Sequence, residues 1–398
     1  MEHYKYLIIG GGMAADAAAK GIREVDPIGP IGLIGTEPVP PYTRPLLSKK
    51  LWKGKPFESI WRGTGDKGVE LHLGRTVQAL NPKDKVVTDD LENTYSYEKL
   101  LLATGCAPRR LSFGGNDIIY YQTVQDYEQL RGLAQGNRHF AVIGGGFIGS
   151  EVAAALAMND QRVTMVFPED GICWRLFPAG LSHFVGNYYR QKGVTLLAKS
   201  TVAGMVKRGE QFVLEHSPVL DPAEPELVVD GVVTGIGVTP NVELAQQAGL
   251  EVANGVVVDD YLCTSLPDIY AAGDIASYYD KALDQRRRVE HEDNAVTMGR
   301  AAGRNMAGAG ERYDHLPYFY SDLFELGYEA VGETDSRLEM VEDWQEEPYH
   351  KGVVYYLRQG RVRGVLLWNV WDQVPHARKL IAEPGPFHPE DLKGRLPA

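Results

Sequence analysis

Leu7-Ile8-Ile9-Gly10-Gly11-Gly12-Met13-Ala14-Ala15 decides the fold of this chain, because an apolar run leads directly into the pattern G-x-G-x-x-A. The pattern returns as G-x-G-x-x-G in Ala141-Val142-Ile143-Gly144-Gly145-Gly146-Phe147-Ile148-Gly149. In such motifs the first glycine permits a tight turn, the second lets the backbone approach a pyrophosphate, and the third position lets helix and strand pack closely. The N-terminus of the following helix offers N–H groups to the anion. Because each copy lies between an expected strand and an alanine-rich helix, the two copies predict two bound dinucleotides.

The composition narrows the class of protein. The chain has 398 residues and a formal net charge of −12, which argues against general binding to nucleic acid or anionic membranes. Cys106, Cys173 and Cys263 form no Cys-x-x-Cys pair and no metal-ligand spacing, which fits a reducing cytosol. The first strand begins within a few residues of Met1, and no apolar run reaches the roughly 18 residues that span a bilayer. We therefore expect a cytoplasmic protein without a metal, a nucleic-acid partner or a membrane span.

The first motif opens a nucleotide-binding domain. Its second expected strand, residues 31–35, ends in Thr36-Glu37. An acid about 20 residues past the glycine-rich turn usually holds a ribose hydroxyl, so Glu37 is the candidate. Prolines make residues 40–49 an expected irregular loop, and loops of this length are often functional. The turn Ala103-Thr104-Gly105 recurs in Thr234-Gly235-Ile236-Gly237, so the repeat extends from the motifs to whole domains.

These patterns predict an α/β fold with two Rossmann-like dinucleotide-binding domains and a C-terminal α+β domain. Residues 1–113 form the first part of the first domain, residues 114–240 form the second domain, and residues 241–316 return to the first. Short strands, followed by a helix near residues 375–382, are expected in the last domain, residues 317–398. Residues 217–226, rich in proline and acids, are expected to form a surface loop.

Several further stretches carry a resemblance to a known family. They are residues 42–52, 144–151, 167–169, 239–245, 289–291, 319–323, 367–370 and 375–379. The chain resembles the pyridine nucleotide-disulfide oxidoreductases, in particular their ferredoxin-reductase-type branch and the family of apoptosis-inducing factors. The resemblance implies non-covalent FAD in the first domain and NAD in the second. We expect no presequence, membrane anchor or long C-terminal insert of the kind that the eukaryotic members carry, so their death-related, DNA-binding role is not expected here.

For FAD, the resemblance implies contacts mostly from the first domain. Asp274 is expected at the ribityl chain, with helix capping as its plain alternative. Arg44 is expected to contact the pyrophosphate or to form a surface salt bridge. Tyr320 stands where the family has a tryptophan near the nicotinamide. The full set is Gly10, Gly12, Ala15, Glu37, Arg44, Lys49, Val77, Thr104, Gly105, Asp274, Glu290, His291 and Tyr320.

The residues expected to act in catalysis are Lys49, Glu151, Phe147 and His291. The resemblance places Lys49 and Glu151 together beside the flavin N5 edge, where a buried lysine and carboxylate must pair because either charge alone is costly to desolvate. There they orient the rings and tune the flavin potential. The plain alternatives are an exposed first-turn acid for Glu151 and a solvated lysine for Lys49. Phe147 is expected to cover the flavin and stack on the nicotinamide; His291 approaches from the other side or is a core histidine.

For NAD, the resemblance adds a specificity residue. Glu169 would accept hydrogen bonds from the adenine ribose and repel a 2′-phosphate, so NADH is expected over NADPH, with nearby Arg175 acting against this preference. The full set is Gly144, Gly146, Phe147, Ile148, Gly149, Glu151, Glu169, Arg175 and Gly237.

The expected function is hydride transfer from NADH to FAD N5, followed by electron transfer to a quinone, a ferredoxin or rubredoxin, or oxygen. Ser48 and Lys49 occupy the region where disulfide reductases keep cysteines, and Cys106 is expected to be a small buried hydrophobe. A ferredoxin or rubredoxin reductase is the alternative; its candidate docking patch, Arg286-Arg287-Arg288, also fits a solvated loop. The resemblance further implies a function of another class, a redox-sensing binding protein that keeps a charge-transfer complex and becomes a homodimer on reduction.

Overall fold

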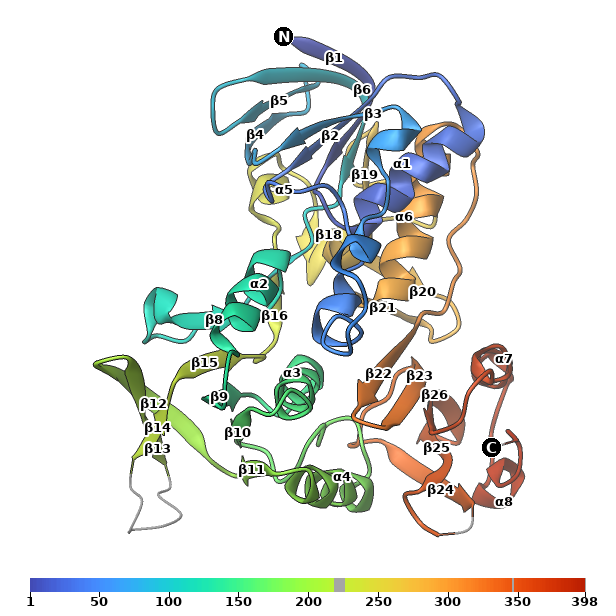
Figure 1. Cartoon of the computed structure of the whole chain (residues 1–398). Helices are drawn as coiled ribbons and strands as arrows, with labels where there is room; N and C mark the ends of the chain where they lie inside the picture. The colour runs from blue at the N-terminus through green and yellow to red at the C-terminus, as the bar shows by residue number, and fades with distance from the viewer. Residues whose placement is uncertain (218–225, 346, 398) are drawn as a thin grey trace. The chain divides into compact units, whose positions relative to one another are not determined.

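The computed structural model describes residues 1–217, 226–345 and 347–397, and the chain divides into two compact units (Figure 1). The first unit contains Met1–Thr43, Glu58–Ala107 and Thr239–Phe319. The second contains Arg44–Phe57, Pro108–Val238 and Tyr320–Ala398. Each glycine-rich motif therefore belongs to a different unit. Most of the surface loop predicted over residues 217–226, namely residues 218–225, lies outside the described residues.

The first unit is built on a seven-stranded sheet in the order β3-β2-β1-β6-β5-β4, with β19 paired to β6. The pairs that involve β1, β2, β3 and β19 are parallel, and β4 and β5 add antiparallel pairs at one end. Because β19 comes after the second motif, the returning chain completes the sheet that the N-terminus began. The strands are β1 (Glu2–Ile9), β2 (Ile31–Gly35), β3 (Val69–Leu73), β4 (Val77–Asn81), β5 (Val86–Asp89), β6 (Thr94–Leu102) and β19 (Ile269–Ala271).

Two helices far apart in the sequence, α1 (Met13–Val25) and α6 (Glu292–Met306), lie side by side in this unit (Figure 1). Their backbones approach closely at glycines. A Cβ added to Gly303 would lie 2.0 Å from the carbonyl oxygen of Ala18, and one added to Gly299 would lie 2.3 Å from that of Ala14. No side chain fits at these two positions of α6, so the glycines allow the two helices to pack in close contact. This packing fixes the position of α1, the helix that follows the first motif, against α6.

The remaining elements of the first unit are short. A four-stranded sheet in the order β17-β18-β20-β21 precedes α6, and β7 and β16 carry the chain between the two units. These elements are η2 (Phe57–Ile60), η3 (Gly65–Lys67), β7 (Cys106–Pro108), β16 (Val238–Pro240), α5 (Glu243–Gln247), β17 (Val252–Ala253), β18 (Gly255–Val257), η5 (Gly273–Ile275), β20 (Ala276–Asp280) and β21 (Gln285–Arg287).

The second unit contains a five-stranded parallel sheet in the order β11-β10-β9-β15-β8. The central strand β9 leads into the second glycine-rich motif and then into α3, the same arrangement as β1 and α1 in the first unit. The elements are η1 (Arg44–Ser48), η4 (Gly115–Asp117), β8 (Ile118–Tyr120), α2 (Val124–Leu133), β9 (His139–Ile143), α3 (Phe147–Ala157), β10 (Arg162–Val166), α4 (Ala179–Gln191), β11 (Val194–Leu197) and β15 (Gly231–Thr234).

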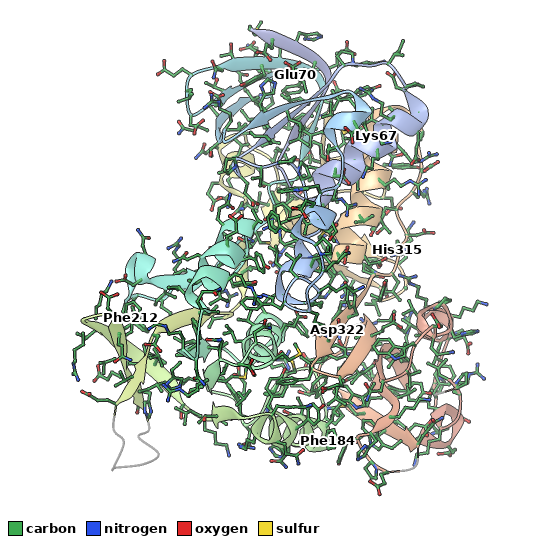
Figure 2. All side chains as sticks on the ribbon, viewed as in Figure 1. Lys67, Glu70, Phe184, Phe212, His315 and Asp322 are labelled. Carbon is green, nitrogen blue, oxygen red and sulfur yellow. The ribbon has the colours of Figure 1, made fainter. Side chains whose placement is uncertain are left out.

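A three-stranded antiparallel sheet covers one face of this parallel sheet. Its strands, in the order β12-β13-β14, are β12 (Thr201–Arg208), β13 (Gln211–Ser217) and β14 (Leu227–Val229). Phe212 and Leu214 of β13 form one buried cluster with Ala141 and Ile143 of β9, and Figure 2 shows Phe212 on this sheet. Because side chains alternate along a strand, Ala141 and Ile143 mark the face of β9 that the antiparallel sheet covers.

The C-terminal part is a five-stranded antiparallel sheet in the order β22-β23-β26-β25-β24, packed with α7. Phe177 packs edge-on against Tyr328 of β23 and Trp368 of β26, at centroid distances of 5.3 and 5.4 Å. This aromatic contact joins the C-terminal sheet to the residues that follow β10. The elements are β22 (Tyr318–Leu323), β23 (Leu326–Gly332), β24 (Glu339–Gln345), β25 (Lys351–Arg358), β26 (Arg361–Trp368), α7 (Val374–Ala382) and α8 (Pro389–Leu392).

The predicted fold class is confirmed, since both motifs follow a parallel strand and open a helix, and a strand-rich part with one main helix ends the chain. One local expectation needs correction. The loop predicted over residues 40–49 is not wholly irregular, because Arg44–Ser48 form the 3-10 helix η1. Pro45, its second residue, is compatible with the first turn of a helix, where the missing N–H has no partner to lose. The division into four sequence segments stays a prediction.

Candidate functional site

The first glycine-rich turn lies in the first unit, between β1 and α1. Gly10 has a φ of +128°, which favours glycine, and a Cβ there would lie 2.0 Å from the carbonyl oxygen of Ala103. Gly12 is the N-cap of α1, where no side chain caps the helix and no atom would lie within 4 Å of an added Cβ. Ala15 is fully buried. The turn thus leaves helix N–H groups beside open space, which fits the pyrophosphate of a dinucleotide.

Several predicted FAD residues from later segments also belong to the first unit. Thr104 and Gly105 follow β6, and Asp274 lies in η5. Arg288 connects two of the predicted residues, because its guanidinium donates to the carbonyl oxygen of Asp274 at 2.9 Å and pairs with the Glu290 carboxylate at 2.6 Å. The side chain of Arg288 is 8% exposed, so this connection is internal.

His291 directly precedes α6 and stacks on Phe319, with ring centroids 4.2 Å apart. Burial, together with the positive charge of Arg287, lowers the pKa of His291 to about 3. The imidazole is therefore neutral near pH 7, so it can exchange hydrogen bonds with a ligand but cannot offer a positive charge. A role for His291 as a cation is excluded by this environment.

The ribose candidates at the end of β2 differ in their surroundings. The Tyr42 hydroxyl donates to the Glu37 carboxylate at 2.7 Å, whereas Thr36 is exposed and accepts a hydrogen bond from Thr76 at 3.2 Å. Val77, the first residue of β4, is half-buried. The ribose contact of Glu37 stays a prediction.

The three cysteines are reduced and poorly suited to redox chemistry. Burial raises the pKa of Cys106 and of Cys173 to about 12, and it also raises that of Cys263. Because the thiolate is the reactive form, these thiols are inert at neutral pH. The prediction that Cys106 is a small buried hydrophobe is confirmed, since it is 7% exposed.

The second glycine-rich turn has the same construction within the second unit. Gly144 has a φ of +112°, and a Cβ on Gly149 would lie 2.0 Å from the carbonyl oxygen of Gly144. Gly146 is the N-cap of α3 and, like Gly12, has open space beside it. The next two side chains, Phe147 and Ile148, are 37% and 40% exposed. Large apolar groups beside an open helix N-terminus fit a site where a flat ring binds.

The most unusual feature of the second unit is a buried ion pair one turn further along α3. Lys49 Nζ lies 2.7 Å from Glu151 Oε1, and the two side chains are 8% and 3% exposed. Ser48 Oγ donates to the other carboxylate oxygen at 2.5 Å, and Ser321 Oγ donates to Oε1 at 2.6 Å. Lys49 Nζ also lies 5.3 Å from the centre of the Tyr320 ring, within range of a cation–π contact.

This cluster, which we call the Glu151 clamp, comprises Glu151, Lys49, Ser48 and Ser321. Three donors satisfy the carboxylate, as a buried charge requires. The exposed-acid and solvated-lysine alternatives are therefore wrong. The sequence reasoning missed Ser48 and Ser321, although a buried carboxylate with one lysine partner has acceptor sites left over, and both serines stand in motifs already noted.

The segment that carries Lys49 is anchored at one backbone atom. The Trp52 indole donates to the carbonyl oxygen of Leu47 at 2.8 Å, and the Tyr121 hydroxyl donates to the same oxygen at 2.6 Å. Trp52 and Leu47 are buried, at 4% and 2% exposure. Leu47 lies two positions before Lys49, and the two hydrogen bonds to its carbonyl oxygen hold η1 in place. The position of Lys49 in the Glu151 clamp is therefore set by the surrounding fold rather than by the lysine itself.

Other predicted residues of the second unit lie outside the clamp. Glu169 follows β10 and is half-buried, whereas Arg175 and Gly237 are exposed. Arg44 donates to the carbonyl oxygen of Gln122 at 2.6 Å. The structure thus places Arg44 in the second unit, against a backbone carbonyl, and its pyrophosphate role stays a prediction.

The proposed basic docking patch needs correction. Arg286 donates to the carbonyl oxygens of Val258 and Ser277, at 3.1 and 2.5 Å, and Arg287 pairs with Asp280 at 3.3 Å. Arg288 has the internal partners described above. All three guanidinium groups therefore bind within the first unit, and the run does not form a free basic surface.

Comparisons with known proteins agree with this arrangement. Residues 4–299 match the family model described as pyridine nucleotide-disulphide oxidoreductase. Residues 302–346 and 340–383 match the model described as apoptosis-inducing factor, mitochondrion-associated, C-term.

Individual relatives are similar over almost the whole chain. Apoptosis-inducing factor 1, mitochondrial, of Dictyostelium discoideum is 34% identical, with 96% of this chain and 79% of that protein aligned. The 5,5′-dehydrodivanillate O-demethylase ferredoxin reductase subunit of Sphingobium is 34% identical, with 96% and 94% aligned. Among solved structures, a covalent putidaredoxin reductase–putidaredoxin complex superposes with a TM-score of 0.88 at 29% identity, covering 98% of this chain and 95% of that one.

Within residues 1–217, 226–345 and 347–397, no helix is both long enough and apolar enough to cross a membrane. The cytoplasmic location stays a prediction.

Proposed function

Because the chain belongs to the pyridine nucleotide-disulphide oxidoreductase family and is an FAD-dependent NAD(P)H oxidoreductase, we propose that it oxidises NADH and passes the electrons to a small iron protein. The similarity to a ferredoxin reductase subunit over 96% of the chain supports an iron-protein acceptor. The alternative acceptors are a quinone and oxygen.

The observation that carries this proposal is the Glu151 clamp. When bound, FAD accepts a hydride from NADH and releases electrons to the acceptor. The buried carboxylate of Glu151 fixes the position of the Lys49 ammonium. The positive charge is therefore already in place when the reaction occurs, and no energy is needed to reorient it. A fixed cation in a water-poor site stabilises negative charge on a neighbouring ligand. In the position where disulfide reductases keep cysteines, this chain has Ser48 and Lys49, and Ser48 serves the clamp.

We further propose the division of labour between the units. In the first unit, Gly10, Gly12 and Ala15 hold the FAD pyrophosphate, with Glu37, Val77, Thr104, Gly105, Asp274, Glu290 and His291 around the rest of the cofactor. In the second unit, Gly144, Gly146 and Gly149 hold the pyrophosphate of NADH, and Phe147 and Ile148 cover its nicotinamide. The open space at Gly12 and Gly146 supports both assignments.

NADH is the proposed donor because Glu169 follows β10, the strand next to the one that carries the motif. A carboxylate there accepts hydrogen bonds from a ribose diol and repels a 2′-phosphate. Glu169→Gln should raise the ratio of kcat/KM for NADPH to that for NADH by about tenfold, because it removes one charge repulsion of roughly 1.4 kcal/mol. An unchanged ratio would remove Glu169 from the specificity site.

The direct test is to add NADH anaerobically to the purified, FAD-loaded chain and to record the visible spectrum, then to add an oxidised ferredoxin, a rubredoxin, a soluble quinone or air. Loss of the oxidised flavin bands on adding NADH, followed by rapid return with one iron protein, is the expected result. Rapid return with a quinone or with oxygen alone would contradict the iron-protein acceptor and leave the NADH step standing.

A second candidate function rests on the match of the C-terminal residues to the apoptosis-inducing factor model. In that reading the chain is an NADH-controlled binding protein that changes from monomer to homodimer on reduction. A long-wavelength band that persists in air, together with a doubled mass by light scattering after NADH addition, would favour this reading. Fast turnover with one acceptor and no change of mass would defeat it.

A further inference from the structure

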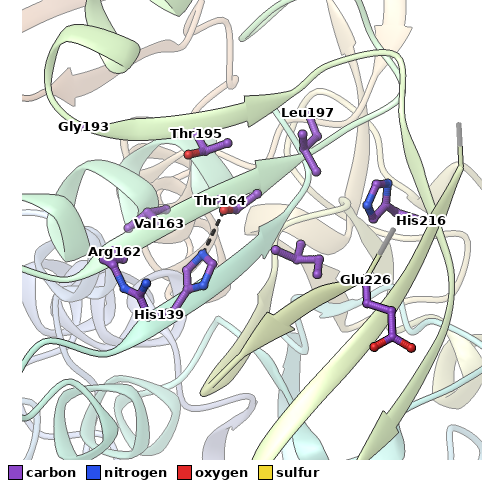
Figure 3. Close-up of a pocket in the computed structure, with 10 residues that line it drawn as sticks. His139, Arg162, Val163, Thr164, Gly193, Thr195, Leu197, His216 and Glu226 are labelled. Atoms are coloured by element: carbon purple, nitrogen blue, oxygen red, sulfur yellow. Dashed lines mark hydrogen bonds between the residues drawn. The ribbon is translucent and has the colours of Figure 1, made fainter. Parts of the chain in front are cut away.

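The second unit has a cavity, lined by both polar and apolar side chains, that the proposed reaction does not use. Its volume is about 320 Å³, and it lies between the parallel sheet and the antiparallel sheet β12-β13-β14 (Figure 3). Ligand sites in proteins typically measure about 300 to 1,000 Å³, so this cavity has room for a small molecule and not for a dinucleotide. Its polar lining comprises His139, Arg162, Thr164, Thr195, His216 and Glu226.

Most of the cavity lining lies toward the opposite end of the parallel sheet from the glycine-rich turn, although Leu197 is the last residue of β11. His139 and Arg162 are the first residues of β9 and β10, and Gly193 directly precedes β11. The turn that starts at Gly144 follows the last residue of β9. Gly144 is five positions after His139 in the sequence, a distance of about 16 Å at roughly 3.3 Å per residue of strand. A small molecule bound around His139 therefore leaves the dinucleotide turn free.

Polar side chains line this cavity because they occupy inward-facing positions of the strands. His139 shares a face of β9 with Ala141 and Ile143, which pack against the antiparallel sheet. Thr164 stands in register with Ala141 on one side and with Thr195 on the other, so both threonines lie on that same face. The space between the two sheets is thus apolar around Ala141 and Ile143 and more polar around His139, Thr164 and Thr195. Inward polar groups cost free energy unless they have hydrogen-bond partners.

Some of these groups are satisfied within the protein. His139 Nε2 shares a 2.9 Å hydrogen bond with the Thr164 hydroxyl, and the ring also bonds the backbone of Val228. Burial, with a contribution from Arg162, lowers the pKa of His139, so the ring adds no positive charge. Glu226 pairs with the Arg208 guanidinium through both carboxylate oxygens, at 3.1 and 3.3 Å, and its negative charge is balanced.

Two groups remain without partners. His216 is 7% exposed, and its Nδ1 is buried with no hydrogen-bond partner among the described residues. The Arg162 guanidinium, which is exposed at the cavity edge, has no hydrogen bond or ion pair to any residue that the structure describes. The hydroxyl-bearing side chain of Thr195 is also exposed. The cavity therefore offers one unpaired guanidinium and one hydroxyl, which together suit an anion, and the buried His216 ring lies in its wall.

We propose that this cavity is a binding site for a small molecule with an anionic group, a carboxylate or a phosphate, which pairs with the Arg162 guanidinium and accepts a hydrogen bond from the Thr195 hydroxyl. Binding there is independent of the dinucleotide site. The buried His216 ring forms part of the cavity wall, and the apolar residues Leu197 and Leu227 contact the carbon skeleton of the bound molecule.

The test uses the full, FAD-loaded chain, which has ten histidines, with ¹³C-labelled histidine rings observed by NMR. His216→Gln assigns the signal of His216. Inorganic phosphate and succinate are titrated separately at constant ionic strength. We expect at least one of them to shift the His216 signal saturably with a Kd below about 1 mM. Saturation with phosphate alone identifies a phosphate ligand, and saturation with succinate alone identifies an organic acid.

Matched arginine variants decide whether the cavity is responsible. Arg162→Gln should weaken binding about tenfold or more, because it removes the charge-assisted hydrogen bonds. Arg138→Gln removes the same charge from a neighbouring residue that does not line the cavity, and it should change the Kd less than about threefold. The absence of a saturable shift with both probes would overturn the proposal. Equal weakening in the two variants, or displacement of the probe by NAD⁺, would overturn it as well.

Discussion

Replacing Lys49 by methionine should leave the buried carboxylate of Glu151 without its positively charged partner. Lys49 Nζ lies 2.7 Å from Glu151 Oε1, and at an effective dielectric constant of about 20 the attraction over that distance is about 6 kcal/mol before desolvation is counted. The desolvation of Glu151 remains after its partner is removed, so Lys49→Met should lower the free energy of unfolding by about 3–5 kcal/mol. Replacing both charges, in Lys49→Met with Glu151→Gln, should recover at least about 2 kcal/mol, because the neutral amide can accept from one serine through its oxygen and donate to the other hydroxyl through its NH2 group.

The assay is urea unfolding at saturating FAD, with all variants compared at the same transition, alongside stopped-flow measurement of flavin reduction by NADH. Stability should return in the double variant, whereas the reduction rate should stay low because the fixed ammonium is gone. Lys50→Met is the matched control, since Lys50 is the next residue and is exposed; it should change stability by less than about 0.5 kcal/mol. If Lys49→Met behaves like Lys50→Met in both measurements, the Glu151 clamp does not hold a buried charge and the reasoning fails.

Three further outcomes are expected. Ser321→Ala removes one hydrogen-bond donor to the Glu151 carboxylate, so it should lower the free energy of unfolding by about 1.5–3 kcal/mol and slow flavin reduction. Ser321→Thr keeps the hydroxyl and should preserve both the stability and the reduction rate. Equal behaviour of the two variants would contradict a role for the Ser321 hydroxyl. Gly303→Ala places a methyl group 2.0 Å from the Ala18 carbonyl oxygen, so it should lower the thermal midpoint of unfolding and the retention of FAD. The control Gly132→Ala, in open space on α2, should instead stabilise the chain by about 0.5–1 kcal/mol. A higher thermal midpoint in calorimetry for Gly303→Ala than for Gly132→Ala would refute the close helix crossing. Because the pKa of His291 is about 3 in the folded chain, the neutral ring makes its full contribution to stability above about pH 6.5, and that contribution is lost as the pH falls toward 3, by at most about 2 kcal/mol at pH 5. His291→Gln should therefore flatten this part of the curve of unfolding free energy against pH. An unchanged curve would show that the ring is hydrated in the folded chain.

Much of the fold could be predicted because its signals are local. An apolar run, a glycine that needs a positive φ and an alanine-rich helix all lie within about fifteen residues, and both copies were recognised this way. The expected strand over residues 31–35 matches β2, and the expected helix near residues 375–382 matches α7. The internal partners of the Arg286-Arg287-Arg288 run, such as Asp280 and two backbone carbonyls, could not be predicted because they are recognisable only once the chain has folded.

The sequence by itself determined the two strand–turn–helix motifs, the class of cofactor and the presence of a lysine and a carboxylate suited to pairing. These follow from steric limits on single residues and from side-chain chemistry, which do not depend on distant parts of the chain. Only the tertiary structure decided which groups satisfy Glu151, because Ser48 and Ser321 are 103 and 170 residues away from it. It also decided that His216 stays without a partner beside Arg162, since a buried group's hydrogen bonds depend on which strands the fold brings together.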